Sequence, residues 1–503
     1  MREIRQLSTV HLVYPGAVHT RFDHSIGVTH LAGIAHRILE EKLRHVPGND
    51  KPRLNEVTQV ALELAALLHD IGHGPFGHAF EAYCKRHLNY ADWSHEDVGR
   101  KILHGEEGFG GEIRESLQEI KKRRESEDQE LAGLLTHTNI GAIAFGKPDQ
   151  LDLGSEDLSK KYYFLCDVIT CAFGIDRLDY LRRDAFFSGV ATGAIDVWEI
   201  IHNMTVFQER DRSWTLKLEI PAAVALEGLL QARNLAYRRL YYHPIHRAAQ
   251  ELLIRGLIEL KVEPAEIALD TDFDILEMLG QEKRGTFANE IRRRIRDRLL
   301  YEVIPLTTHG RIYDLRGNSL LYETFRFSVG PEEQPRPKNQ LDIESRLHTQ
   351  ELKLKSGRVL FDRERIPAWK KEDLEDKWLL DPSKGPLSLF EAMPHLAVVL
   401  SHLPMRTTPG YELFMDFVSM IYVSLPFDHL RSKLLQAQNK YKAFPKEHVV
   451  EEVYKDTLQP VANALLVDMA GFSRSDGSKS DIFKEVERNL VRHLDGLAQS
   501  VLG

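Results

Sequence analysis

The sequence predicts a mainly α-helical protein, with a helical core and a smaller, mixed α/β lobe toward the C-terminal end. Three observations support this fold class. Residues 21–43 repeat apolar side chains at helical spacing, and residues 54–69 and 162–180 are apolar enough to form buried helices. Beyond residue 260 the helical pattern weakens into short strand-like runs and turns, whereas residues 390–503 are again mainly helical.

The chain of 503 residues is too long for one simple core. We therefore expect two units, a helical core at residues 1–260 and a second lobe at residues 261–503. Two short β elements interrupt the first unit. Val10 to Tyr14 is a β-branched and aromatic run that predicts one arm of a small hairpin, and residues 198–218 predict a short strand pair.

Composition narrows the class of protein. A hydrophobic content of 43% and a charged content of 28% are ordinary for a soluble globular protein. The net charge of −9 argues against a globally basic nucleic-acid binder, so we expect no nucleic-acid partner. No apolar run reaches the roughly 18 residues that a membrane span needs. The three cysteines lie in no metal-ligand spacing and follow no secretory signal, which predicts a cytoplasmic protein.

The segment 62–78 predicts a buried helix that ends in a polar site. Leucine and alanine fill its first part, and three histidines and one aspartate follow within ten residues, where glycines and a proline end the helix. These polar residues are His69, Asp70, His73 and His78. Burying imidazoles and a carboxylate beside aliphatic groups costs on the order of several kcal/mol unless a cation or hydrogen bonds compensate. We therefore expect further ligands elsewhere in the chain.

Two other helices carry candidate partners. Arg21 and His24 share one face at the start of the helix over 21–43, where the helix dipole also favours anions. At the end of the apolar segment 162–180, Arg177, Tyr180 and Asp184 fall on one stripe, and Asp176 lies on the neighbouring edge. Taken singly, each group has a simpler explanation as a surface ion pair or a solvated helix face.

Two shorter segments add histidines. His78 and Glu81 are three residues apart on a predicted short helix, a spacing that lets a carboxylate orient an imidazole. Ser94 and Asp97 have the pattern of a helix cap, but capping does not explain the intervening His95.

Together these segments supply four potential metal ligands, namely His24, His69, Asp70 and Asp176. Two imidazoles and two carboxylates suit a divalent ion such as Mn, Fe, Zn, Ni or Mg and do not choose among them. Many cationic or hydrogen-bond-donating side chains near one metal describe a pocket for an anion, most commonly phosphate. Phosphoryl transfer needs such groups to meet the charge on the phosphate oxygens and an acid to meet the leaving oxygen.

The order His24, then His69-Asp70, then Asp176 is the H…HD…D signature of HD-domain phosphohydrolases, which the chain therefore resembles. Further motifs make the likeness more specific, toward the deoxynucleoside triphosphate triphosphohydrolases and the branch of the sterile-alpha-motif and HD-domain dNTPase and its bacterial relatives. These motifs are 6–7, 14–17, 19–25, 69–78, 93–96 and 176–180. The resemblance covers residues 1 to about 300, without a sterile-alpha-motif domain, and implies an HD-domain helical core.

The resemblance implies a role for each matching residue. The metal would be held by His24, His69, Asp70 and Asp176, and the phosphates would be bound by Arg21, Arg177, Tyr180 and Arg233. His78 would be the acid for the 5′-oxygen, oriented by Glu81, and His73 and His95 would line the α-phosphate. The sugar would be contacted by Gln6, Leu7, Asp184 and Tyr241, with Tyr241 crowding a 2′-hydroxyl. The implied reaction is hydrolysis of a deoxynucleoside triphosphate to a deoxynucleoside and tripolyphosphate.

The resemblance also implies a homo-oligomer and allosteric control by a nucleotide activator. The basic helix that ends at residues 298–301 resembles the family's distal nucleotide-contacting helix, although a solvated basic helix explains it equally well. The family's regulatory site uses the segment before Gln6, and this sequence begins after it. Either the start is truncated or misassigned, or that site is missing.

Three other functions are compatible with these residues. One is an HD hydrolase for another phosphate ester, such as a nucleoside monophosphate or a cyclic nucleotide, against which the additional arginines Arg21, Arg177 and Arg233 favour a triphosphate. Another is a regulatory or defence protein that senses deoxynucleoside triphosphates with little turnover, against which the intact ligand set argues. The third, a nuclease, is disfavoured by the acidic net charge.

Overall fold

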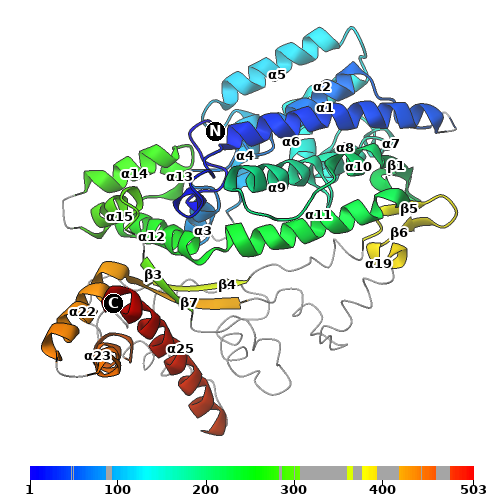
Figure 1. Cartoon of the computed structure of the whole chain (residues 1–503). Helices are drawn as coiled ribbons and strands as arrows, with labels where there is room; N and C mark the ends of the chain where they lie inside the picture. Colours follow the sequence, from blue (N-terminus) through cyan, green and yellow to red (C-terminus); the bar gives the residue numbers. More distant parts are fainter. Residues whose placement is uncertain are drawn as a thin grey trace.

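The computed structural model of the chain describes residues 1–46, 48, 50–86, 93–282, 286–299, 301–305, 360–365, 376–393, 419–442, 445–459 and 476–502. Helices dominate it, which confirms the mainly α prediction (Figure 1). Up to residue 299 the helical elements are η1 (Val10–Leu12), α1 (Arg21–His45), α2 (Glu56–Leu68), α3 (His78–Arg86), α4 (His95–His104), α5 (Gly110–Arg124), η2 (Leu131–Leu135), α6 (His137–Ala144), η3 (Pro148–Gln150), α7 (Glu156–Lys160), α8 (Phe164–Thr170), α9 (Ile175–Ser188), α10 (Val197–His202), η4 (Ile220–Ala222), α11 (Ala223–Ala236), η5 (Tyr237–Tyr241), α12 (Pro244–Leu260), α13 (Pro264–Ile267), α14 (Asp272–Gln281) and α15 (Phe287–Arg296). None of the described helices combines the length and the apolar character that a bilayer crossing requires.

Two small sheets accompany the helices. The predicted strand pair is present as β1 (Met204–Gln208) and β2 (Trp214–Glu219), which are antiparallel. β2 continues in parallel to β5 (Leu379–Asp381), and β5 pairs antiparallel with β6 (Gly385–Leu387). The second sheet has the order β3-β7-β4 and is antiparallel. Its strands are β3 (Tyr301–Pro305), β4 (Leu360–Arg365) and β7 (Ser419–Pro426).

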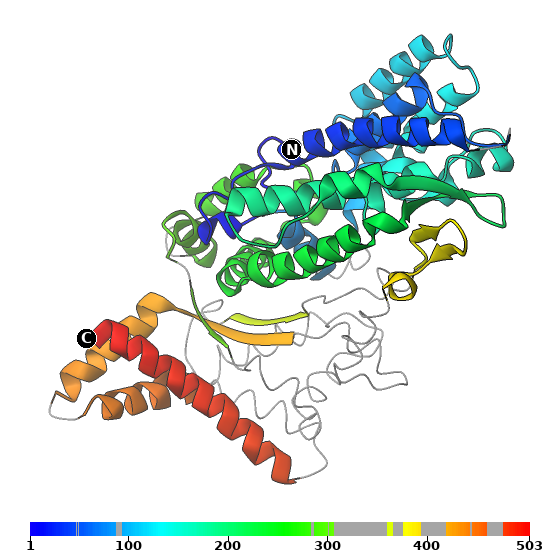
Figure 2. The same ribbon diagram turned by 45° about the vertical axis from the view of Figure 1, so that its right-hand side comes forward.

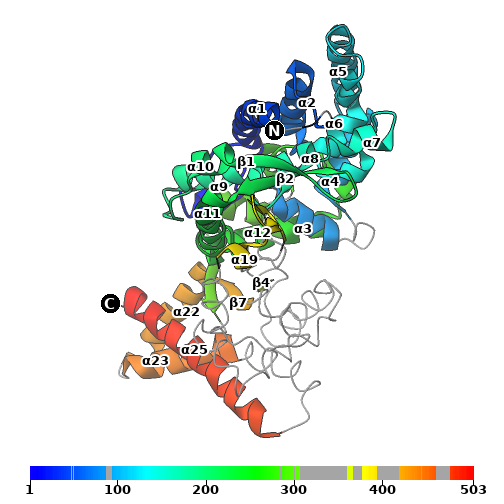
Figure 3. The same ribbon diagram turned by 90° about the vertical axis from the view of Figure 1, so that its right-hand side faces the viewer.

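The predicted mixed C-terminal lobe combines the second sheet with helices. These are α22 (Phe427–Lys440), α23 (Lys446–Val453), η7 (Tyr454–Leu458) and α25 (Asp476–Leu502), and α19 (Leu389–Ala392) lies beside β6. Helices α22, α23 and α25 contact one another and gather at the end of the molecule away from α1 (Figure 3). β3 and β4 contact α12, so the second sheet joins this lobe to the first.

The largest core cluster of described residues lies around α1. This helix contacts both α2 and α9, and the ribbon of α1, drawn in blue, runs alongside α9 in Figure 2. One face of α1 packs Val28, Ala32, Ala35 and Leu39 into this core, and α2 contributes Ala61, Leu62 and Ala65. Burial of these apolar side chains holds the three helices together. As a result, the first turn of α1, the last turn of α2 and the first turn of α9 meet.

The starts of α1 and α2 are fixed by capping boxes. The Thr20 hydroxyl accepts a hydrogen bond from the amide of Asp23, whose carboxylate accepts one from the amide of Thr20. Asn55 and Thr58 make the equivalent pair at α2. Such caps satisfy amides that would lack partners at a helix start. The cap at Thr20 places Arg21 and His24 in the first turn of α1, as the sequence predicts.

Two local predictions are wrong. Val10 to Leu12 form a 3₁₀ turn with bonds from residue i+3 to residue i, because Val10 and Leu12 are buried there and tertiary packing overrides their β propensity. The predicted single helix over 162–180 is two helices, α8 and α9, separated at 171–174. A Cβ on Gly174 would lie 2.2 Å from the carbonyl oxygen of Ile169, so the close approach at this break requires glycine.

Candidate metal centre

Three of the four predicted ligands converge in the structure. His24 lies in α1, His69 is the residue that ends α2, and Asp176 lies in the first turn of α9. Their ligating atoms all lie within 4.8 Å of one another, and both histidines are buried. Residues more than 150 positions apart in the sequence thus form one candidate His/Asp metal site.

The hydrogen bonds at the outer edges of the two imidazoles determine which nitrogen faces inward. The Nδ1–H of His69 donates to the carbonyl oxygen of Ala66 at 2.7 Å, and Nδ1 of His24 lies 2.8 Å from a carboxylate oxygen of Asp179. Both Nδ1 atoms therefore carry protons, and the two Nε2 atoms face each other at 3.2 Å. Two neutral imidazoles would here point lone pairs at each other, an arrangement that a cation between them stabilises.

The Asp176 carboxylate completes the donor set. Its Oδ1 lies 3.0 Å from Nε2 of His24 and 3.5 Å from Nε2 of His69. Two imidazole nitrogens and a carboxylate oxygen fit a divalent metal ion but leave its identity open.

The fourth predicted ligand, Asp70, flanks this group. Its carboxylate oxygens lie 3.5 Å from Nε2 of His69 and 3.8 Å from Nε2 of His24. One of these oxygens also accepts a hydrogen bond of 2.6 Å from Arg21. Arg21, predicted to bind phosphate, is therefore buried against a carboxylate of the cluster, where it balances charge.

The cluster shifts the titration of its members strongly. Burial alone would lower the pKa of His24, but hydrogen bonds to Asp176 and Asp179 outweigh it and raise the pKa to about 10. The pKa of His69 is raised in the same way against burial, chiefly by Asp70. Burial would raise the pKa of Asp176, but its bonds to His24 and His69 lower it. In the metal-free protein, protons on the imidazoles would thus take the place of a cation.

A second group of histidines borders the cluster. The rings of His73 and His95 stack with centroids 3.8 Å apart, and Nε2 of His73 lies 3.4 Å from Asp70. Burial and then the charge of Arg21 hold the pKa of His73 well below its usual value, so this imidazole is neutral. Its Nδ1 is buried and has no hydrogen-bond partner among the described residues.

His78 and Glu81 lie in the first turn of α3, as predicted. The side chain of His78 is 77% exposed, and its Nδ1 lies 3.2 Å from Glu81, which also contacts Lys85 at 2.6 Å. Burial opposes ionisation of Glu81, but His78 and then Lys85 lower its pKa to about 2. A fully ionised carboxylate therefore orients the imidazole, whose ring is 5.8 Å from that of His73.

The predicted phosphate-binding residues on α9 and α11 lie near Tyr180. The ring of Tyr180 is 6.4 Å from that of His24, and burial raises its pKa although the charges of Arg177 and Arg233 oppose this. Arg177 donates to the carbonyl oxygen of Ala172 at 2.7 Å, and Arg233 stacks on Tyr237. The two guanidinium groups thus lie close enough to Tyr180 for their charges to act on its hydroxyl.

The four predicted sugar-contacting residues also come together. Tyr241 donates a hydrogen bond of 2.6 Å to Asp184, and its ring packs against the small cluster that contains Leu7. Gln6 precedes Leu7, and its buried Oε1 has no hydrogen-bond partner among the described residues. The N-terminal segment and η5 therefore meet beside α9.

Three residues at the site were given no role from the sequence, although His19 and Asp179 lie within the matched motifs. Asp179 lies against His24, Arg183 pairs with Asp179, and His19 lies 2.8 Å from Asp184 while stacking on Phe187. The spacing of Asp179 to Arg183, i to i+4 on one helix, indicates an ion pair. It does not indicate that the pair would reach a histidine on α1.

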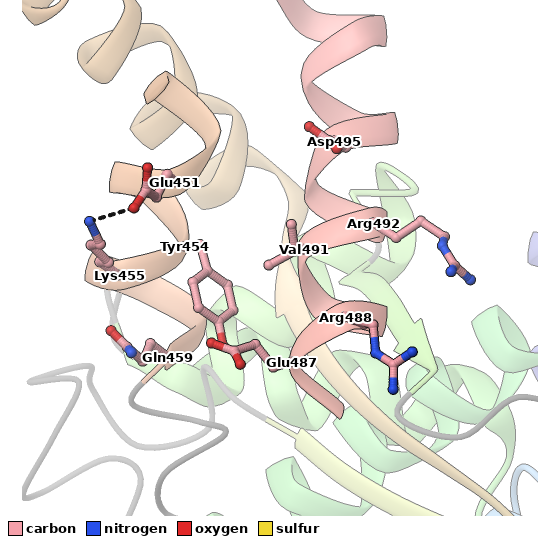
Figure 4. Close-up of a pocket in the computed structure, with 9 residues that line it drawn as sticks. All are labelled: Glu451, Tyr454, Lys455, Gln459, Glu487, Arg488, Val491, Arg492 and Asp495. Atoms are coloured by element: carbon pink, nitrogen blue, oxygen red, sulfur yellow. Dashed lines mark hydrogen bonds and ion pairs between the residues drawn. The ribbon is translucent and has the colours of Figure 1, made fainter. Parts of the chain in front are cut away.

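A separate pocket of about 500 Å³ lies between η7 and α25 in the C-terminal lobe (Figure 4). Its charged residues have both signs and partly pair with each other, as Lys455 does with Glu451. Tyr454 donates to Glu487, and Arg488 and Arg492 point away from this tyrosine (Figure 4). The lining therefore favours no single ligand charge.

Comparison with known families agrees with this arrangement. Residues 21–170 match the HD domain, and residues 195–313 match the HD associated region. The two regions together cover just over half of the chain. Three of the four predicted metal ligands lie in the first region, and Asp176 lies between the two.

Individual relatives each match about half of the chain. YwfO of Bacillus subtilis, described as uncharacterized, is 29% identical over 261 residues, which are 52% of this chain and 49% of YwfO. The deoxynucleoside triphosphate triphosphohydrolase SAMHD1 of Danio rerio is 27% identical over 280 residues, 52% of this chain and 41% of the relative. The alignments span about half the length of these relatives.

Solved structures show the fold over most of the chain. A hypothetical protein from Aquifex aeolicus is 24% identical with a TM-score of 0.53, covering 85% of this chain and 89% of that one. A phosphohydrolase from Bacteroides thetaiotaomicron is 21% identical with a TM-score of 0.51, covering 84% and 92%. With an HD domain, the HD associated region and relatives that include SAMHD1 dNTPases, the chain belongs to the HD-domain family.

Proposed function

We propose that this protein hydrolyses deoxynucleoside triphosphates to deoxynucleoside and tripolyphosphate at the centre formed by His24, His69 and Asp176. The observation that carries the proposal is the convergence of these three ligands beside neutral and exposed histidines and two arginines. Similarity to SAMHD1 dNTPases supports the choice of substrate. The metal, when bound, would polarise a phosphoryl oxygen or activate a water molecule.

His73 is suited to contact the α-phosphate. Its imidazole is neutral and stacked against His95, so its orientation is fixed without the cost of a buried positive charge. Nε2 lies 3.4 Å from the Asp70 carboxylate, so the single proton of the neutral ring sits on Nε2, and the unpartnered Nδ1 keeps its lone pair. From this position the Nε2–H of His73 can donate a hydrogen bond to a phosphate oxygen bound beside Asp70.

His78 is suited to protonate the leaving 5′-oxygen. Glu81 accepts a hydrogen bond from the Nδ1–H of His78, which leaves Nε2 on the exposed side of the ring to deliver a proton. The low pKa of Glu81 keeps it ionised through the physiological range, so it can stabilise the imidazolium form.

Discrimination between sugars is assigned to Asp184 and Tyr241. Asp184 accepts hydrogen bonds from Tyr241 and His19, which fixes both of its oxygens. A fixed carboxylate can accept a hydrogen bond from a sugar hydroxyl, and a fixed phenol ring beside it limits the space for a second hydroxyl. Phosphate contacts are assigned to Arg177 and Arg233, and a nucleotide activator and a homo-oligomer remain predictions.

The proposal is tested by incubating the purified protein with each deoxynucleoside and ribonucleoside triphosphate in the presence of Mn or Mg. Anion exchange then separates nucleoside, phosphate, pyrophosphate and tripolyphosphate. We expect deoxynucleoside and intact tripolyphosphate, with ribonucleotides hydrolysed more slowly. Release of orthophosphate or pyrophosphate would show that a bond other than the one between the 5′-oxygen and the α-phosphate is cleaved, which would contradict the proposed reaction. Absence of turnover with every nucleotide, alone or in pairs, would contradict the proposed reaction and favour a sensor.

A further inference from the structure

An ordered chain of polar contacts runs from Arg183 through Asp179 to His24. Arg183 binds Asp179 with a two-pronged hydrogen bond, since its Nε and one terminal nitrogen each lie 2.8 Å from a different carboxylate oxygen. The oxygen that accepts from Nε also lies 2.8 Å from Nδ1 of His24. The side chains of His24 and Asp179 are only 1% and 9% exposed, so water competes little with these contacts.

We propose that Asp179, held by Arg183, is a positioning residue that fixes His24 with Nδ1 protonated and Nε2 directed into the metal centre. The two-pronged hydrogen bond from Arg183 fixes the orientation of the Asp179 carboxylate. The fixed carboxylate in turn selects one tautomer and one ring orientation of the His24 imidazole. A carboxylate behind a ligating histidine also makes that histidine a stronger ligand.

The helix packing is shaped around this contact. Gly27 lies on α1 one turn after His24, and a Cβ at Gly27 would lie 2.1 Å from both Arg183 and Asp179. A side chain at residue 27 would therefore push the ion pair away from His24. Its absence lets the ion pair of α9 approach the backbone of α1.

The same helix offers an internal comparison. Asp184 is also buried on α9 and also lies 2.8 Å from a buried histidine, His19. His19 is not among the metal-cluster residues. A metal affinity that responds to Asp179 but not to Asp184 would therefore reflect the contact with His24, whereas a general loss of packing on α9 would affect both.

The inference rests on the metal centre of the proposed function but not on its substrate. The experiment accordingly measures the dissociation constant of Mn or Zn for the purified full chain by competition with a chelating dye, and folding is monitored by circular dichroism. We expect Asp179→Asn to weaken metal binding by about 10- to 100-fold. Its amide cannot accept from both Arg183 and His24 without turning an N–H toward one of them. Arg183→Lys should weaken binding less, because it keeps the charge but loses the fork.

Gly27→Ala tests the geometry without removing a polar atom. We expect it to weaken metal binding in the same direction as Asp179→Asn, although alanine favours a helix over glycine. Gly111→Ala in the first turn of α5, where an added Cβ meets open space, is the matched control. Neither it nor Asp184→Asn should change the dissociation constant for metal by more than about twofold, within the few tenths of a kcal/mol expected of distant sites.

Wild-type metal affinity in Asp179→Asn would overturn the inference, as would an equal loss in Asp184→Asn. If Asp179→Asn does not fold, Arg183→Lys and Gly27→Ala decide by the same criterion, and wild-type affinity in both would overturn it. Failure of the substrate assignment leaves these outcomes unchanged, because none of them depends on turnover.

Discussion

At the scale of single residues, His78 has the most exposed imidazole at the site, and its contact with Glu81 gives it one defined role. We expect His78→Ala to lower kcat for deoxynucleoside triphosphates by about 10²- to 10⁴-fold, the usual contribution of a general acid. Metal content should stay at the wild-type level, since His78 does not belong to the ligand cluster. Steady-state kinetics and metal analysis of the same preparation check this. An unchanged kcat would remove His78 from the acid role.

The buried His36 should make the stability of the folded protein depend on pH. Its Nε2 donates to the hydroxyl of Thr58 at 2.8 Å, its Nδ1 is buried, and burial lowers its pKa to about 4. The unfolded chain has the ordinary pKa near 6.5, so below that value the unfolded state binds a proton that the folded state does not. Stability is therefore lost as the pH falls from about 6.5 toward 4.

His36→Gln should remove this part of the pH dependence, because glutamine can still donate to Thr58 but does not titrate. Between pH 7.5 and pH 5.0 the wild type should lose about 2 kcal/mol more than the variant. Urea unfolding of both proteins at the two pH values, followed by circular dichroism, measures the difference. Equal losses of stability in the two proteins would show that the pKa of His36 is the same in the folded and unfolded states, which would contradict this prediction.

Sequence reasoning located His24, His69 and Asp176 because each stands in a motif or at a helical spacing that local physics can interpret. Sequence reasoning gave Asp179 no role, because that role depends on how α9 lies against α1. The i to i+4 spacing of Asp179 and Arg183 indicates a simple surface ion pair, and the space that admits it comes from a glycine 152 positions earlier than Asp179. Local sequence periodicity does not predict contacts between helices that are far apart in the sequence.

At the scale of elements, the break between α8 and α9 decides where Asp176 lies. An apolar run with one glycine predicts a continuous helix, whereas α8 ends at Thr170 and α9 begins at Ile175. The chain between them brings Gly174 so close to the carbonyl oxygen of Ile169 that a residue with a side chain would not fit. The 3₁₀ turn at Val10–Leu12 likewise depends on tertiary packing. Its β-branched and apolar residues favour a strand locally, but Val10 and Leu12 take the conformation that buries them.

Gly174→Ala should therefore disturb both the fold and the centre. Its Cβ would meet a backbone atom, which cannot move aside as a flexible side chain can, so we expect a loss of about 1–3 kcal/mol in stability. Displacement of the first turn of α9 should also weaken metal binding. Gly228→Ala on α11, where the nearest atom is 3.7 Å from the added Cβ, is the control and should be neutral or slightly stabilising. Thermal melts with and without metal compare the two. Equal melting temperatures would contradict the strain at Gly174.

At the scale of the whole molecule, the helical lobe brings every predicted site residue into one region, while the C-terminal lobe contributes none of them. The mainly α core and the mixed second lobe follow from composition and periodicity, and the structure confirms both. The expected boundary at residue 260 stays a prediction. Helices α13 to α15, which follow that boundary, pack with α3 and α12 in one hydrophobic cluster.

The most direct test of the metal centre strips the protein with a chelator and restores Mn or Mg stepwise while bound metal and turnover of a deoxynucleoside triphosphate are measured together. We expect turnover to rise in proportion to bound metal up to one catalytic ion per chain, and His69→Ala to lose both. His69 is the decisive residue because its Nε2 faces that of His24, while its Nδ1–H donates to the carbonyl oxygen of Ala66. Full turnover in the stripped protein, or in a His69→Ala variant that binds no metal at this site, would contradict the account.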